Sequence, residues 1–79
     1  MIELYLPASG KRYDIRIPAI LRVGDIILLI EKCMAQLEKG YFVIRGDAVL
    51  CDRITGLALD VNLTPNELGI LNGTKLMLI

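Results

Sequence analysis

The chain opens with alternating apolar and polar residues. Ile2, Leu4 and Leu6 alternate with Glu3 and Tyr5, which predicts a strand with one buried face. A turn containing glycine follows at residues 7–10, and a second alternating run covers residues 13–17 until Pro18 stops it. Two alternating runs joined by such a turn predict a β-hairpin.

After Arg22 the apolar residues recur at helical spacing. Lys39 and Gly40 follow the last of them, and Gly commonly ends a helix, so we expect the helix to end near residue 40. Leu29 lies at the edge of the apolar stripe, whereas Leu28 points away from the expected core. The stripe consists of Val23, Ile26, Ile27, Ile30, Cys33, Met34 and Leu37.

Residues 41–60 allow two interpretations. In the first, Tyr41–Asp47 is a loop, Ala48–Asp52 is the third strand and Leu57–Asp60 is a short fourth strand. In the second, the third strand is Tyr41–Arg45 and the turn is at residues 45–47. Both interpretations give the same topology. They differ in the boundaries of the third strand, which are the least certain part of such a prediction.

The carboxyl-terminal part predicts a helical turn and a closing strand. Thr64, Pro65 and Glu67 form a capping-box pattern, and Asn72-Gly73 marks a tight turn. In the strand that follows, Leu76 and Leu78 should face the helix, and Met77 and Ile79 should face away from it.

We predict that the first and last strands are adjacent and parallel at the centre of the sheet, since both have one strongly apolar face. The fold class is then α+β, a mixed sheet of four to five strands packed on one helix. Its 79 residues should form a single domain, residues 1–79.

The composition argues against several classes of binding partner and several cellular locations. Nine acidic and nine basic residues give zero net charge, which provides no electrostatic footprint for nucleic acid or an anionic membrane. The longest aliphatic run, Ile26–Ile30, is far shorter than the roughly 20 residues of a membrane span. No signal peptide is evident at the amino terminus, so we expect a cytoplasmic protein with reduced thiols. Both Cys33 and Cys51 are then expected to be small core residues.

Residue content also argues against catalysis. The chain has no His, which removes the usual general base and metal ligand. Acidic residues are scattered rather than clustered, and the glycines form no phosphate-binding pattern. We therefore expect no enzymatic activity, no catalytic or metal-binding residues and no cofactor.

The element order, with Leu68-Gly-Ile70 before Asn72-Gly73 and a closing strand, resembles the ubiquitin-like β-grasp fold. Tyr13–Ala19 leading into Val23–Ile30 narrows the resemblance to the YukD/EsaB family, small ubiquitin-like proteins associated with bacterial type VII secretion. The resemblance implies a cytosolic accessory that binds membrane components or the ATPase of the secretion machine. It carries over no catalytic residue.

A ubiquitin-like protein is conjugated through a flexible tail ending in Gly-Gly, whereas this sequence reaches Leu78-Ile79 within a strand. We therefore expect a non-conjugated module. An accessory β-grasp subunit of a multicomponent enzyme such as an oxygenase is the alternative, and a carrier of sulfur or a conjugated modifier is a weaker one.

Two surfaces are candidates for binding protein partners. Lys75, Met77 and Ile79, with Tyr5 as neighbour, should lie on the sheet face away from the helix, which is also the face that ubiquitin uses for most partners. Leu28, on the outer side of the helix, is a second candidate, for weak self-association. Small sheets also expose aliphatic side chains without function, so the pattern by itself leaves both possibilities open.

Overall fold

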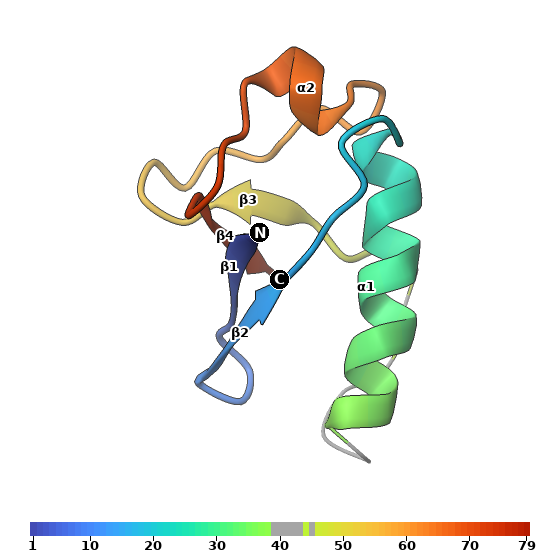
Figure 1. Cartoon of the computed structure of the whole chain (residues 1–79). Helices are drawn as coiled ribbons and strands as arrows, with labels where there is room; N and C mark the ends of the chain where they lie inside the picture. The colour runs from blue at the N-terminus through green and yellow to red at the C-terminus, as the bar shows by residue number, and fades with distance from the viewer. Residues whose placement is uncertain (39–43, 45) are drawn as a thin grey trace.

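The computed structural model describes residues 1–38, 44 and 46–79. Within these residues, four strands and two helices follow one another (Figure 1). They are β1 (Ile2–Leu6), β2 (Lys11–Ile15), α1 (Val23–Leu37), β3 (Leu50–Asp52), α2 (Pro65–Leu68) and β4 (Lys75–Leu78).

The sheet has the strand order β2-β1-β4-β3. β1 pairs in parallel with β4, and the two outer strands pair antiparallel with these central ones. The prediction that the first and last strands are adjacent, parallel and central is therefore confirmed.

The turn before β4 is joined to the start of β1. Gly73 has a φ of 83°, a conformation that glycine adopts without a steric penalty, and its N–H donates to the Met1 carbonyl at 2.8 Å. The terminal amine of Met1 donates to Asn72 Oδ1 at 2.6 Å. These bonds direct β4 into position beside β1.

Helix α1 lies against one face of the sheet (Figure 1), and the core is formed between the two layers. Leu4, Leu76 and Met34 have no exposed surface. Leu76 and Leu78 both face the core, as predicted. The remaining members of this cluster are Ile2, Leu6, Val23, Ile26, Ile27, Ile30 and Leu50.

The helix presents most of the predicted face to the core, since Val23, Ile26, Ile27, Ile30 and Met34 are buried, but two predicted members of the stripe are not. Cys33 is exposed and Leu37 is 54% exposed, whereas Glu31 and Glu38 are buried. Cys33 lies toward a groove beside the end of β2 rather than against the sheet, so its assignment to the core is wrong. Burial of Cys51 is confirmed.

The end of the helix also differs in part from the prediction. α1 ends at Leu37, and Glu38 is its cap residue, with its N–H bonded to the Met34 carbonyl. Lys39 and Gly40, the predicted end, lie outside the described residues. Leu29, expected to tuck against the stripe, is 49% exposed.

The observed strands are shorter than the alternation suggested. β2 covers residues 11–15 rather than 13–17, because the ladder with β1 ends at the Ile2–Ile15 pair. β3 falls within the predicted segment 48–52. The alternative strand at 41–45 lies, apart from Ile44, outside the described residues.

The predicted strand at 57–60 is reduced to a bridge between Cys51 and Ala58. Asp52 Oδ1 accepts the N–H groups of Ile54 and Thr55 in a tight turn, and Asp60 Oδ1 accepts the N–H of Asn62. Because these turns lie on either side of Ala58, the pairing does not extend beyond the bridge. The described part of the sheet therefore has four strands.

The capping box of α2 is confirmed. Thr64 Oγ1 accepts the Glu67 N–H at 3.2 Å, and Glu67 Oε1 accepts the Thr64 N–H at 3.0 Å. Gly69 then ends the helix in the left-handed region. Leu68 and Ile70 on either side of it pack against the core, so this turn closes one end of the molecule.

Candidate protein-interaction site

The sheet face opposite the helix brings together the four residues predicted for binding on that face. Tyr5 and Met77 are direct neighbours across the parallel β1–β4 pair, and Glu3 and Lys75 form the pair next to them. Lys75 is exposed and Met77 is half-buried. We call Tyr5, Lys75, Met77, Ile79 and Val49 the outer-face patch.

Val49 joins this patch because it pairs with Ile79. The Val49 N–H donates to the Ile79 carbonyl at 2.8 Å, and the Ile79 N–H donates to the Val49 carbonyl at 2.9 Å. Residues that exchange both bonds lie directly opposite, with side chains on one face. Ile79 is 50% and Val49 is 39% exposed, so the two form the most accessible apolar part of the patch.

Tyr5 is held in place by charged neighbours. The Arg53 guanidinium lies 4.4 Å from the centre of the Tyr5 ring, a cation–π geometry. Arg53 Nη1 also donates to Glu3 Oε1 at 2.8 Å. The bonded pair fixes the guanidinium over one side of the ring, so this corner of the patch has a defined shape.

Arg53 and Val49 were not predicted as site residues. Each owes its place to the register of β3 on β4, in which Cys51 lies opposite Met77. Alternation within the sequence fixes the face on which a residue lies, but the register of a short strand depends on its partner. The Arg53 N–H, bonded to the Lys75 carbonyl at 3.0 Å, reflects the same register.

Leu28 lies on α1 and is 53% exposed, as predicted. It is separate from the outer-face patch, because α1 packs on the opposite face of the sheet. The structure therefore groups Tyr5, Lys75, Met77 and Ile79 on one surface and leaves Leu28 on another.

An apolar groove of about 270 Å³ lies between α1 and the chain that leaves β2. Its lining is largely aliphatic, with Arg16 and the exposed Cys33 as its polar or reactive members. Such a lining offers contact area rather than acid–base chemistry. The lining residues are Ile15, Arg16, Ile17, Pro18, Ile26, Leu29, Ile30, Cys33 and Met34.

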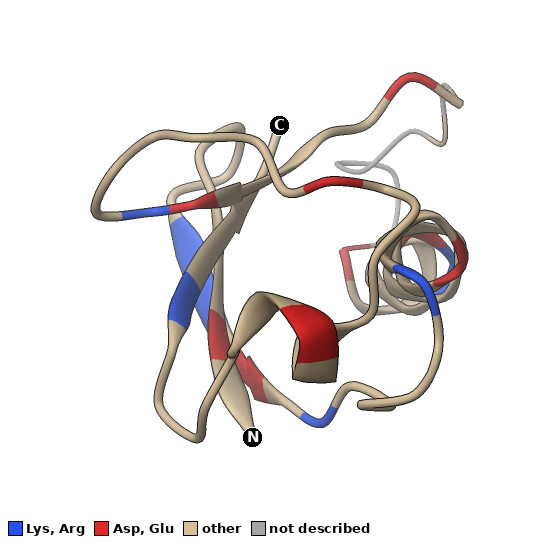
Figure 2. Cartoon of the chain, turned by 90° about the horizontal axis from the view of Figure 1, so that it is seen from above, with Lys and Arg blue, Asp and Glu red and all other residues tan. Residues whose placement is uncertain are grey.

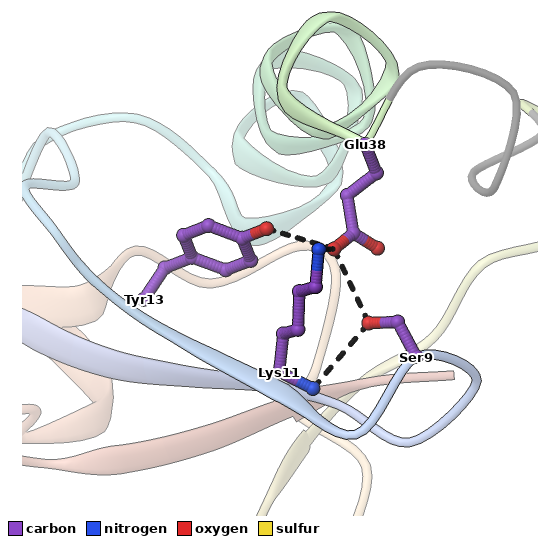
Figure 3. A network of polar contacts seen from close by, with 4 residues as sticks. All are labelled: Ser9, Lys11, Tyr13 and Glu38. Atoms are coloured by element: carbon purple, nitrogen blue, oxygen red, sulfur yellow. Dashed lines mark hydrogen bonds and ion pairs between the residues drawn. The ribbon is translucent and has the colours of Figure 1, made fainter.

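A polar network ties the end of α1 to the β1–β2 hairpin (Figure 3). The Tyr13 hydroxyl donates to Glu38 Oε2 at 2.7 Å, and the Ser9 hydroxyl donates to the same oxygen at 3.2 Å. Lys11 Nζ lies 4.0 Å from it. The bond to Glu38 is the main cause that raises the pKa of Tyr13 above its ordinary value, followed by burial and by the carboxylate charge. This network stabilises the fold and leaves Glu38 enclosed.

The described residues contain no group of three potential metal ligands. Acidic and basic positions are distributed over the sheet, the helix and the connecting loops (Figure 2). Among the parts of the chain that the structure describes, no helix is both long and apolar enough to cross a membrane. The outer-face patch combines exposed and half-buried apolar side chains with a charged residue, a composition found at protein interfaces.

The fold is that of the ubiquitin-like β-grasp class: a mixed four-stranded sheet with one main helix across it. Among solved structures, the chain is similar to the ubiquitin-like domain of the Mycobacterium tuberculosis type VII secretion system protein ECCD1. The TM-score is 0.73 at 14% sequence identity, and the match covers 99% of this chain and 96% of that one. No family model matches the sequence, and no curated protein matches it. At this identity the likeness establishes the fold.

Proposed function

We propose that this chain is a ubiquitin-like interaction module of a bacterial type VII secretion system, of the YukD/EsaB kind. It acts by binding protein components of the machine, with the ATPase or a membrane component as partner. It works in the cytoplasm and catalyses no reaction.

The observation that supports this proposal most is the match to the ECCD1 domain, which extends over almost the whole of both chains. The two chains therefore share the complete β-grasp unit rather than a common hairpin. That neighbour is a domain of a secretion-system protein, and a domain of the same fold would suit docking onto such an assembly.

The outer-face patch supplies a binding surface for this role. It combines half-buried Met77 and Tyr5 with more exposed Val49 and Ile79, and Lys75 stands at its margin. An apolar centre with a charged rim is the usual composition of a protein interface. Burial of Ile79 and Val49 by a partner would add to affinity, at up to about 1.5 to 3 kcal/mol for complete burial of one large aliphatic side chain.

We also propose that the module is not conjugated. The 79 residues contain no Gly-Gly pair, the motif through which a ubiquitin-like protein is conjugated. Intact-mass analysis of the protein from its native cells checks this point. A species in which the chain is joined covalently to another protein would contradict the proposal.

The role itself is tested by affinity capture from native cytosol and membrane fractions. We expect the chain to retain an ATPase or membrane protein of a type VII machine, and its gene to lie beside genes for that machine. Retention of oxygenase subunits, with oxygenase genes as neighbours, would contradict the proposal and favour an accessory subunit of a multicomponent enzyme.

A further inference from the structure

Strand β2 forms one edge of the sheet, and its second side has no strand partner among the described residues. The opposite edge, β3, is partly covered, since the Leu59 N–H donates to the Leu50 carbonyl and Ala58 bridges to Cys51. An uncovered edge presents unpaired N–H and C=O groups that can pair with another strand.

The register identifies the backbone groups at this free edge. The Glu3 N–H donates to the Thr74 carbonyl beside β4, so the residues on either side of Glu3 direct their backbone groups toward β2. Their partners, Tyr13 opposite Leu4 and Ile15 opposite Ile2, bond back to β1. Because backbone direction alternates along a strand, Arg12 and Asp14 direct their N–H and C=O groups to the free edge, and Arg16 follows one residue beyond the end of β2.

The side chains along this edge alternate in exposure, and the exposed ones alternate in charge. Arg12, Asp14 and Arg16 are exposed and carry charges of alternating sign. Ile15, between them, is half-buried and packs against the helix-side core. Around Ile15 the edge is therefore apolar toward the helix, and its exposed positions carry charges in the order plus-minus-plus, a pattern that can complement itself.

The helix side of the same edge is also incompletely covered. The groove beside residues 15–18 is bordered on α1 by Leu29 and Cys33, both exposed. A strand that pairs with this edge could bury its own apolar side chains against this groove.

We propose that two copies of this chain associate by pairing their β2 edges antiparallel, about a two-fold axis at Ile15. In this register Asp14 of each copy lies opposite Arg16 of the other, so both charge pairs are complementary. On the helix side, Ile15 lies beside Ile15 of the second copy and Tyr13 lies beside Ile17. A self-complementary contact of this kind is the rule for two-fold dimers.

Charge excludes or disfavours the neighbouring registers. An axis at Asp14 would place Asp14 opposite Asp14 and Arg12 opposite Arg16, and like charges directly opposite are destabilising. An axis at Tyr13 would pair Arg12 with Asp14, but it would place Lys11 beside Ile15 and leave Arg16 opposite glycine. The register centred on Ile15 ends naturally, because Pro18, which has no N–H, falls opposite Arg12.

This surface is distinct from the outer-face patch that carries the proposed function. Dimerisation through β2 can be disproved while the patch still binds a partner, and the reverse also holds. The side chains of Asp14 and Arg16 form no ion pair or hydrogen bond with any described residue, so exchanging either charge breaks no such interaction within the monomer.

The test is sedimentation equilibrium of the purified chain up to about 1 mM, a range that captures weak association. We expect the mass to rise from monomer toward dimer with concentration. Asp14→Arg and Arg16→Asp should each remain monomeric, since each places two like-charged pairs across the axis. An equimolar mixture of the two variants should dimerise again, because every pair across the axis is then complementary. Lys32→Asp, the same charge change on the exposed side of α1, should dimerise like the original chain.

Circular dichroism and thermal melting of each variant exclude unfolding as the cause. A chain that stays monomeric throughout this concentration range overturns the proposal. This holds even if a peptide from another protein is found to bind at the β2 edge. Dimers that persist in both single variants, or a mixture that stays monomeric, also overturn it by locating the contact elsewhere.

Discussion

Two buried carboxylates, one within α1 and one at its carboxyl-terminal cap, have contrasting surroundings. Glu38 is 3% exposed and accepts hydrogen bonds from Tyr13 and Ser9. Glu31 is 2% exposed, and its Oε2 has no hydrogen-bond partner. A buried polar atom without a partner keeps its cost of desolvation, so the two glutamates should respond in opposite ways to substitution.

Glu31→Met should raise the free energy of unfolding by about 1 to 3 kcal/mol, because it replaces an uncompensated polar group by an apolar side chain of similar length. Urea denaturation measures this change. Lys32→Met, on the neighbouring exposed position, serves as the control and should change stability by less than about 0.5 kcal/mol. A clear loss of stability in Glu31→Met would show that the carboxylate has a partner in solution.

Tyr13 should make stability depend on pH in the alkaline range. Its pKa is raised in the folded state, so the folded protein holds the phenolic proton more tightly than the unfolded chain does. The contribution of the protonated Tyr13 hydroxyl to folding stability is complete below the ordinary pKa of 10.0. It is lost as pH rises through the raised folded-state pKa. Tyr13→Phe should therefore melt below the original chain at pH 7, and the gap should narrow above pH 10. A gap that is constant from pH 7 to 11 would contradict the hydrogen bond to Glu38.

The elements follow from local sequence to different extents. Alternation in residues 2–6 and 75–79 correctly predicted which faces of β1 and β4 are buried, because the side-chain period of a strand is fixed by its backbone. The capping box of α2 depends on three residues close in sequence and was also predicted. The orientation of α1 was predicted less well: Cys33 faces the groove, and Glu31 is buried in place of an apolar residue.

Ile30 and Leu28 give a direct test of that helix orientation. Ile30 is 4% exposed within the core cluster, and Leu28 is 53% exposed. Ile30→Ala should cost about 2 to 5 kcal/mol of unfolding free energy, through lost burial and the cavity left behind. Leu28→Ala should cost less than about 0.5 kcal/mol. Chemical denaturation compares the two, and similar losses would mean that the helix packs with another face inward.

For the molecule as a whole, the sequence predicted the central pair of strands and four of the five residues of the outer-face patch. Tyr5, Lys75, Met77 and Ile79 lie on one face, as alternation requires, but Arg53 and Val49 join them only through the pairing of β3 with β4. That register arises between segments distant in sequence and leaves no local signal. The unpaired β2 edge likewise follows from strand order, which single residues do not encode.

We propose that the outer face of the sheet, rather than the helix, contacts the secretion machine. The claim concerns surfaces of similar exposure, since Ile79 is 50% and Leu28 is 53% exposed. Aspartate at either position should leave the core intact, so differences in binding can be assigned to the surface that each substitution alters.

The most direct measurement is quantitative capture of one identified secretion-machine component by four forms of the protein. These are the original chain, Met77→Asp combined with Lys75→Glu, Ile79→Asp, and Leu28→Asp as the matched helix control, each first shown to be folded by its melting temperature. We predict that both outer-face variants lose at least about tenfold in affinity, or about 1.4 kcal/mol, and that Leu28→Asp binds like the original chain. Undiminished capture by the two outer-face variants, together with loss of capture by Leu28→Asp, would contradict the account and assign the binding surface to α1.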